Sequence, residues 1–252
     1  MIKTSIFNKS ANRQIVDHKG CFQVIEHDRD LSVYPDSAER AYYASQMNVH
    51  RRQVLANLAG NAVIVQSGAM QMMLGNLDAA TDVKGAGDLF KKAFAGKVTG
   101  ESAIKPKYSG NGVLVLEPTY KHLLLEDLSE WNGSVVIDDG LFLACESTVN
   151  ISTVARSNLS SALAGGEGLF NTCLSGNGVA VLESPVPREE LIEIQMDNDV
   201  VKIDGNFAIA WSNTLQFTVE KTTKTLIGSA ASGEGFVNVY RGSGKILVAP
   251  VT

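Results

Sequence analysis

The sequence predicts an all-β protein built from three similar units, and two observations support this prediction. One phrase occurs three times, as SGNGVLVLE at 109–117, SGNGVAVLE at 175–183 and RGSGKILVA at 241–249. Its first glycines, Gly110, Gly176 and Gly242, lie 66 residues apart (176 − 110 and 242 − 176). Short apolar runs beside glycine-rich turn signals follow in each copy, which is typical of strands. We expect a pseudo-three-fold β-sandwich or barrel body with short helical insertions in the first unit.

The repeat continues on both sides of this phrase. Upstream, TGESAI at 99–104, GGEGLF at 165–170 and SGEGFV at 232–237 are in register. A glycine also precedes an earlier apolar run in each copy, at Gly68, Gly140 and Gly205. We therefore expect residues 1–252 to form a single body whose approximate repeats are 1–118, 119–185 and 186–252. This division leaves no room for a separate catalytic domain.

The first unit contains the two segments expected to be helical. The run SAERAYYASQM at 37–47 is rich in helix formers and follows Pro35, which favours a short helix. The segment KGAGDLFKKAFAGKVTG at 84–100 occurs only in this copy. Its spacing predicts an amphipathic helix with an apolar stripe and a basic face. The stripe and the face consist of Leu89, Phe90, Ala93 and Phe94, and of Lys91, Lys92 and Lys97.

Two interpretations of the basic insertion stay open. Phe90 and Phe94 could pack on the body and leave Lys91 and Lys92 solvated, as on most short amphipathic helices. Alternatively, these four residues contact an acidic protein partner or an anionic lipid surface, where each lysine contributes about 1 kcal/mol. Exposure of both phenylalanines would distinguish the two interpretations. A second basic cluster, His50 with Arg51 and Arg52, is interpreted as a solvated strand edge.

The repeated phrase predicts one buried strand per unit. The runs at 113–116, 179–182 and 246–248 are too short for helices and too apolar for strands with one wet face. The preceding SGNG and GSGK are interpreted as turns, because they lack the spacing of a phosphate-binding loop. In the third unit, alternation places Leu215, Phe217 and Val219 on one face of a strand.

Three glutamates in register form the most notable polar set. Glu101, Glu167 and Glu234 each follow a glycine, so their carboxylates could accept hydrogen bonds from a neighbouring turn at each repeat junction. This structural role is the preferred interpretation, because the turn itself explains a glutamate that repeats with it. The alternative is that the pseudo-symmetry brings all three together to bind a cation or a basic ligand.

Composition excludes several classes of protein. The net charge of −5 and the pI near 5.4 argue against a general nucleic-acid binder, which needs a positive surface. Three widely spaced cysteines suit reduced thiols better than a disulfide framework. The start of the chain does not resemble a signal peptide, and no run of about twenty apolar residues could span a bilayer. We expect a cytoplasmic protein, with peripheral membrane attachment as an open alternative.

The residues give no signal for catalysis, a metal or a cofactor. The four histidines, His18, His27, His50 and His122, form no HxH or HxxxH pair. Cys145 and Cys173 lie in apolar runs, where a thiol is buried and inert. We therefore expect no catalytic residue, no metal and no cofactor.

Four segments resemble a known family along nearly the whole chain. They are residues 37–77, 87–102, 165–178 (GGEGLFNTCLSGNG) and 204–221 (DGNFAIAWSNTLQFTVEK). They are similar to the altered-inheritance-of-mitochondria family, member twenty-four, a former domain of unknown function. The resemblance implies repeated β-units like those of the tryptophan RNA-binding attenuation protein. Mitochondrial relatives are associated with inner-membrane organisation, and bacterial ones have no assigned activity.

The sequence thus favours a non-enzymatic scaffold or interaction protein. The alternative is a small-ligand module with a pocket at the repeat junction, where Gln66, Gln71 or Asn76 supply polar contacts. A concave pocket with convergent polar groups would distinguish the module from the scaffold, and an enzyme would also need a titratable group with a shifted pKa there. Edge strands make a homo-oligomer of unknown order plausible.

Overall fold

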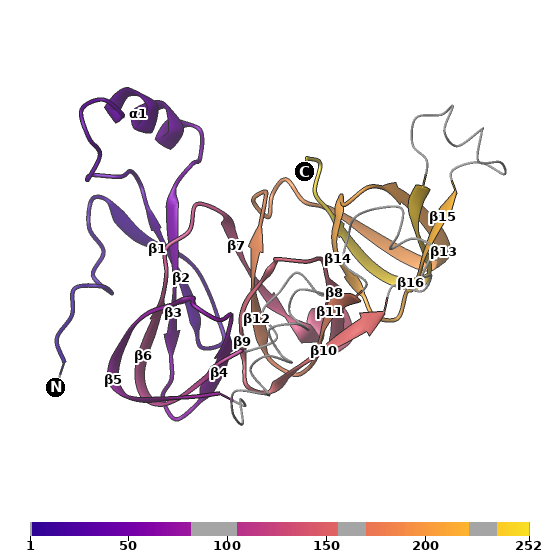
Figure 1. The fold of residues 1–252 in the computed structure, drawn as a ribbon, viewed down its shortest axis with the longest axis horizontal. Coiled ribbons are helices and arrows are strands. Elements are labelled where there is room, and N and C mark those ends of the chain that lie inside the picture. The colour runs from indigo at the N-terminus through magenta and orange to yellow at the C-terminus, as the bar shows by residue number, and fades with distance from the viewer. Residues whose placement is uncertain (1, 82–104, 156–169, 222–235, 252) are drawn as a thin grey trace, which may run out of the picture.

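The computed structural model of the chain describes residues 2–81, 105–155, 170–221 and 236–251. Within these ranges the chain is almost entirely β-structure, with one α-helix and one short 3-10 helix (Figure 1). The predicted all-β class is therefore confirmed. The helix expected at 37–47 is present, whereas the one expected at 84–100 lies outside the described residues.

The elements follow the three units along the chain. The first unit contains β1 (Arg13–Lys19), β2 (Phe22–His27), α1 (Ala38–Gln46), β3 (Arg51–Asn57), β4 (Ala62–Val65), β5 (Met70–Ala80) and β6 (Lys107–Leu116). The second contains β7 (His122–Asp127), the 3-10 helix η1 (Leu128–Trp131), β8 (Ser134–Ile137), β9 (Phe142–Glu146), β10 (Val149–Ala155), β11 (Phe170–Gly176) and β12 (Val179–Ser184). The third contains β13 (Ile192–Asp204), β14 (Ala208–Ser212), β15 (Gln216–Lys221) and β16 (Phe236–Val248).

The strands form two antiparallel sheets that both cross a border between units. The first runs β1-β2-β3-β6-β4-β9-β12-β7, with β5 also on β6. The second runs β10-β11-β8-β14-β16-β13, with β15 also on β16. The first and second units join where β4 pairs with β9, and the second and third join where β8 pairs with β14.

The same hydrogen bonds recur in each unit. The residue that closes the repeated phrase donates its backbone N–H to the residue just after the glycine turn, in all three copies. The bonds are Glu117 to Ala69 at 2.7 Å, Glu183 to Leu141 at 2.8 Å and Ala249 to Phe207 at 2.7 Å. The glycines before these acceptors, Gly68, Gly140 and Gly205, all have positive φ, as tight turns require. The predicted three-fold repetition is thus visible in the backbone itself.

The turn predicted at SGNG and GSGK is correct in only one copy. In the second unit, β11 ends at Gly176 and β12 begins at Val179. In the first and third units, Gly110 and Gly242 instead lie inside the uninterrupted strands β6 and β16. Gly110 has φ +123°, and a Cβ there would overlap the carbonyl oxygen of Asn76 on β5. Gly110 therefore allows β5 and β6 to approach closely, which is a different use of a residue without a side chain. A Cβ at Gly242 would make only ordinary contacts.

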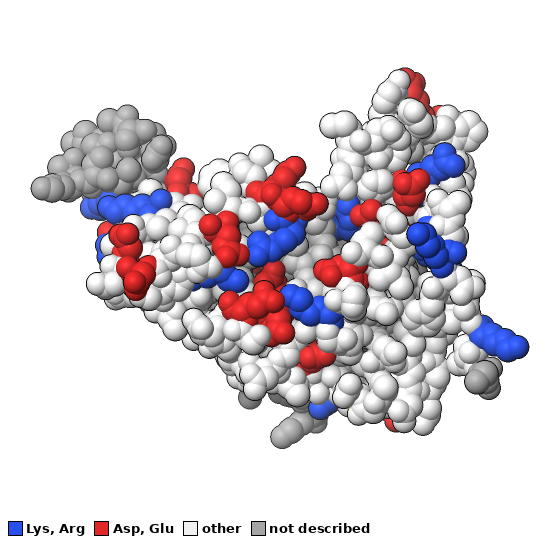
Figure 2. Space-filling model, turned by 180° about the vertical axis from the view of Figure 1, so that it is seen from behind, with Lys and Arg blue, Asp and Glu red and all other residues white. Residues whose placement is uncertain are grey.

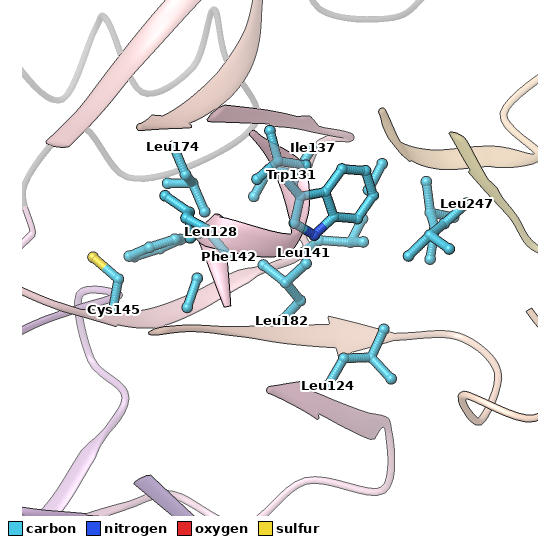
Figure 3. Close-up of a cluster of buried hydrophobic side chains, with 14 of the residues drawn as sticks. Leu124, Leu128, Trp131, Ile137, Leu141, Phe142, Cys145, Leu174, Leu182 and Leu247 are labelled. Atoms are coloured by element: carbon cyan, nitrogen blue, oxygen red, sulfur yellow. The ribbon is translucent and has the colours of Figure 1, made fainter. Parts of the chain in front are cut away.

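Buried apolar side chains fill the space between the strands. One cluster combines residues of the second and third units, among them Trp131, Leu182 and Leu247, which converge from η1, β12 and β16 (Figure 3). A second cluster combines the first and second units, for example Phe22, Val54 and Val181. The core is thus continuous across both unit borders. No helix in the described ranges is long and apolar enough to cross a bilayer.

Candidate functional site

Residues 28–49, here called the projecting arm, leave the body between β2 and β3 and carry α1 (Figure 1, upper left). The helix follows from its run of Ala, Glu, Arg and Gln, all good helix formers. After Met47 the chain turns at Asn48, whose φ is 61°. A nine-residue helix is too short to be stable alone in water, so the body must hold the arm in place.

The arm exposes large side chains that monomeric proteins usually cover. None of the residues of α1 is buried. Tyr34 is 77% exposed, Tyr42 58%, Tyr43 61% and Met47 76%. The rings of Tyr42 and Tyr43 pack edge to face with centroids 5.4 Å apart. Exposed tyrosine and methionine side chains are typical of protein interfaces.

Arg52, at the start of β3, forms hydrogen bonds at both ends of the arm. Its side chain is only 6% exposed, and its Nε donates to the Glu26 carboxylate at 2.7 Å. One terminal nitrogen donates to the Asn48 side-chain oxygen at 2.8 Å and the other to the His50 carbonyl at 3.4 Å. Because Glu26 precedes the arm and Asn48 ends it, one guanidinium fixes the distance between its two ends.

Further contacts surround the root of the arm, which is the place where the chain leaves the body after β2 and returns to it at β3. Arg51 Nε lies 3.4 Å from the carboxylate of Asp30, and the Tyr120 hydroxyl donates to the same carboxylate. His50 Nδ1 lies 3.1 Å from the His27 carbonyl oxygen. The interpretation of His50, Arg51 and Arg52 as a solvated strand edge is therefore wrong. Acceptors from both ends of the arm converge on them, and Arg52 is buried.

Two histidines near the root have lowered pKa values. Burial, followed by the positive charges of Arg51 and Arg13, lowers the pKa of His27 below 6.5, with Asp30 opposing this effect. Burial and then Arg52 lower the pKa of His122 in the same way, although Glu189, Glu190 and Glu26 oppose it. Both shifts favour the neutral form of the imidazole.

A charged network occupies the junction of the second and third units. Lys245, almost fully buried, places its Nζ 4.1 Å from the ring centroid of Trp131 and 3.9 Å from Glu193. The Trp131 indole donates to Glu126 at 2.9 Å, and Arg188 bonds Glu193 at 3.0 Å. Acidic and basic side chains likewise alternate over the middle of the face in Figure 2. The acidic and basic groups of this junction are thus paired with one another or with Trp131.

The residues chosen from the sequence as possible contacts lie outside the described ranges. Phe90, Lys91, Lys92 and Phe94 fall within 82–104, and so does Glu101; Glu167 and Glu234 fall within 156–169 and 222–235. The strands that flank two of these ranges pair to their ends, Ala80 with Lys107 and Lys221 with Phe236. Convergence of the three glutamates and exposure of the basic insertion therefore stay predictions.

The polar residues proposed for a pocket have other partners. Gln66 accepts a hydrogen bond from Lys105 at 3.1 Å, and Gln71 accepts one from the buried Gln53 at 2.6 Å. Asn76 lies opposite Asn111 in the β5–β6 pair. A hollow of about 230 Å³ lies instead beside β1, between it and the N-terminal segment. It is lined by Ile6, Phe7, Asn8, Lys9, Arg13, Gln14, Ile15 and Ile25.

The thiols lie where nucleophilic chemistry is disfavoured. Burial raises the pKa of Cys145 to about 12. Burial, and then the Glu146 carboxylate, raise the pKa of Cys21 to about 12 as well. That carboxylate accepts the backbone N–H groups of Cys21 and Val179, both at 3.0 Å, and so joins turns of the first two units. Among the described residues, no three His, Cys, Asp or Glu side chains are grouped to hold a metal ion.

Sequence reasoning missed the projecting arm as an exposed surface, although it predicted α1. The periodicity of 37–47 gives a weak apolar stripe, and only the fold shows that none of the residues of α1 is buried in the part of the chain that the structure describes.

Comparison with known proteins relates the chain to one family and to proteins of Streptococcus pyogenes. A family model described as mitochondrial biogenesis AIM24 matches residues 46–251. An uncharacterised protein of Streptococcus pyogenes serotype M6 is 28% identical over 197 residues, which cover 75% of this chain and 77% of that protein. A crystal structure of a Streptococcus pyogenes protein from a structural genomics consortium has a TM-score of 0.60 and 25% identity, covering 82% of this chain and 90% of that one.

Proposed function

The chain belongs to the mitochondrial biogenesis AIM24 family, and from this premise we propose that it is a non-enzymatic scaffold or interaction protein whose projecting arm contacts a protein partner. The observation that carries the proposal is the arm itself. A buried arginine fixes both ends of 28–49 to the body, and the tyrosines and Met47 of this segment are exposed. A protein gains from exposing such side chains when a partner covers them.

The charge of the arm favours a protein partner over an anionic lipid surface. Residues 28–49 contain the acidic Asp28, Asp30, Asp36 and Glu39, against the basic Arg29 and Arg40. A net negative segment is repelled by anionic headgroups, which attract lysine and arginine. Attachment to such a membrane would therefore require the basic insertion at 84–100 rather than the arm.

The absence of an enzymatic role is part of the proposal. A catalytic group needs a cavity and a pKa suited to proton transfer or nucleophilic attack. In the described ranges, none of the groups with shifted pKa values lines the hollow beside β1. We place the protein in the cytoplasm, where its cysteines, all free, would stay reduced.

Affinity capture from the native host tests this function. The bait would be the tagged wild type, a Tyr42→Ser, Tyr43→Ser variant, and a control with Ile192→Ser and Val251→Ser, which are equally exposed apolar residues away from the arm. We expect the wild type and the control to retain the same protein and the arm variant to lose it at least tenfold, measured by quantitative mass spectrometry.

Two results would contradict the proposal. Undiminished capture by the arm variant would show that the partner binds elsewhere. If neither the wild type nor the control retains any protein, the interaction role itself is wrong.

A further inference from the structure

The two junctions between units have the same strand pairing. In each, a short strand of one unit pairs antiparallel with the strand that follows the glycine turn of the next unit. The pairs are Val63 with Glu146, Ile64 with Cys145 and Val65 with Ala144 in the first junction, and Val135 with Ser212, Val136 with Trp211 and Ile137 with Ala210 in the second. The register of the two junctions is the same, because each residue of β8 lies 72 positions after its counterpart in β4. Each residue of β14 likewise lies 66 positions after its counterpart in β9.

The backbone hydrogen bonds at both ends of each junction also match. At one end, Gln66 donates to Leu143 at 2.8 Å, as Asp138 donates to Ile209 at 2.9 Å. At the other end, the next unit donates back: Ser147 to Ala62 at 2.9 Å and Asn213 to Ser134 at 3.3 Å. The junction is therefore a standard contact that the molecule makes twice.

At each end of the row of units, one of the two strands of this junction is present without its partner. We call each such strand a free half of the junction. Residues 200–203 of β13 correspond to β4 and β8, because Val201 pairs with Tyr240 as Val63 pairs with Tyr108. Residues 72–74 of β5 correspond to β9 and β14, because Met73 pairs with Leu114 as Cys145 pairs with Ala180. In the part of the chain that the structure describes, β13 pairs only with β16 and β5 only with β6.

Side chains on the unpaired strands are more exposed than their counterparts inside the junctions. Cys145 and Trp211, which lie inside junctions, are 0% and 4% exposed, whereas their counterpart Met73 is 40% exposed. Val200, at the start of the other half, is 47% exposed. The two edges lie at opposite ends of the molecule, β5 at the left and β13 at the right of Figure 1. They cannot meet within one chain.

We propose that a second copy of this chain completes the contact, so that β13 of one molecule pairs antiparallel with β5 of the next, head to tail. The register of the two internal junctions places Val201, Lys202 and Ile203 opposite Leu74, Met73 and Met72 of the second copy. Asp204 donates its backbone N–H to Gln71, and Gly75 donates to Val200.

The shape of β5 favours another copy over an unrelated strand. Its register shifts between Met70 and Met72, and the same shift occurs in β9 between Phe142 and Ala144 and in β14 between Ala208 and Ala210. The edge of β5 thus has the irregularity that β4 and β8 already fit. Unpaired edges readily recruit strands, and a contact between two different surfaces of one protein builds head-to-tail assemblies.

Site-directed crosslinking tests the register. Met73→Cys and Lys202→Cys would each be made in a Cys21→Ser background, because Cys21 is the one native cysteine that is not buried among the three. Residues opposite each other in such a pair have Cα atoms about 5.5 Å apart, which suits a disulfide. Under mild oxidation we expect a covalent dimer when the two variants are mixed and none from either alone. Met47→Cys, at an exposed site on α1, mixed with Lys202→Cys controls for random collision.

A proline variant tests the contact without a crosslink. The backbone N–H of Lys202 points to the same side of β13 as that of Asp204, because residues two apart on a strand share a side. Asp204 is the counterpart of Gln66 and Asp138, which donate across the two internal junctions. Lys202→Pro therefore removes an N–H at the free edge and leaves the pairing with β16 intact. Light scattering over a range of concentrations should show mass above the monomer for the wild type and monomer for the variant, whose melting temperature should match that of the wild type.

Three results would overturn the proposal. The first is a wild type that stays monomeric at every concentration with no crosslink in the mixture. The second is a covalent dimer from Met73→Cys alone, which would mean that two β5 edges pair with each other. The third is a folded Lys202→Pro variant that associates like the wild type. None of these measurements depends on the projecting arm, so the partner proposed above is tested separately.

Discussion

Arg52 connects β2, the end of the projecting arm and β3 through a single side chain. Its guanidinium donates to a carboxylate, a side-chain amide and a backbone carbonyl from three places in the chain. A lysine could not make these contacts together, because its ammonium is a point charge without the planar fork. The arm is therefore positioned by one residue more than by its own helix.

Replacement of this arginine should loosen the arm and destabilise the body. For Arg52→Ala we expect a loss of about 3 kcal/mol in the free energy of unfolding, because Glu26 would keep a largely buried charge without its partner. Urea denaturation measures this loss, and trypsin should cleave faster at Arg40 in the arm. Arg51→Ala is the matched control. Its partly exposed pair with Asp30 should contribute less than about 1 kcal/mol. Equal losses for the two variants would contradict the role assigned to Arg52.

The two neutral histidines should make stability depend on pH. The pKa values of His27 and His122 are lower in the folded state than the ordinary value of 6.5. As the pH falls through 6.5, the unfolded chain binds protons before the folded one, so stability is complete above 6.5 and declines below it. We expect the urea midpoint to decrease between pH 7.5 and 5.5, and a His27→Gln, His122→Gln variant to show a flatter profile. An unchanged slope in that variant would assign the pH dependence to other groups.

At the scale of elements, the same glycine motif serves two purposes. In the second unit it makes a turn between β11 and β12, and in the first and third it lies inside β6 and β16. The sequence could not distinguish these outcomes, because Gly-Asn-Gly favours a turn locally. In the first unit the opposite strand β5 runs unbroken past Gly75, and in the third β13 continues along β16. In the second unit the opposite strands are divided, β9 from β10 and β7 from β8.

A pair of alanine substitutions separates close approach from backbone strain. Gly110→Ala must tolerate both a positive φ and an overlap with the Asn76 carbonyl, whereas Gly140→Ala has a positive φ of 77° and open space. We expect a loss of about 1 kcal/mol at Gly140 and more than about 2 kcal/mol at Gly110. Thermal or chemical denaturation provides the comparison. Similar losses at both positions would mean that β5 can move away from the added methyl group at little cost in free energy.

At the scale of the whole molecule, the core links the units into one cooperative body. The cluster around Trp131 and Leu182 contains Leu247 from the third unit, and the one around Phe22 contains Val181 from the second. A unit removed from its neighbours would therefore expose half of a cluster. The second unit contributes to both clusters and holds the other two together.

Truncation of a shared core residue should lower the stability of the entire chain. Leu182→Ala leaves a cavity in a fully buried site, and we expect a loss of about 3 kcal/mol with a single calorimetric transition. Ile192→Ala, at a 52% exposed position, should change stability by less than about 0.5 kcal/mol. Two separate transitions in the Leu182 variant would show that the units unfold independently.

The sequence predicted the all-β class, the three-fold repetition and α1, because these follow from local patterns and from spacing. The family was predicted from the resemblance of long segments to its members. It did not predict the burial of Arg52, since Glu26 and Asn48 meet it only after the arm has folded back. It likewise gave no sign of the free halves at β5 and β13, because which strand lies at an edge depends on pairing between segments far apart in the chain. The features that the sequence did not predict all depend on contacts between segments far apart in the chain.

The repeated junction also has a consequence for how such chains evolve. Because β4–β9 and β8–β14 use one register, the same pairing could join a further unit to either end of the row. A tandem duplication in frame would encode a fourth unit with a ready-made binding edge, so lengthening the gene lengthens the protein without the invention of a new interface.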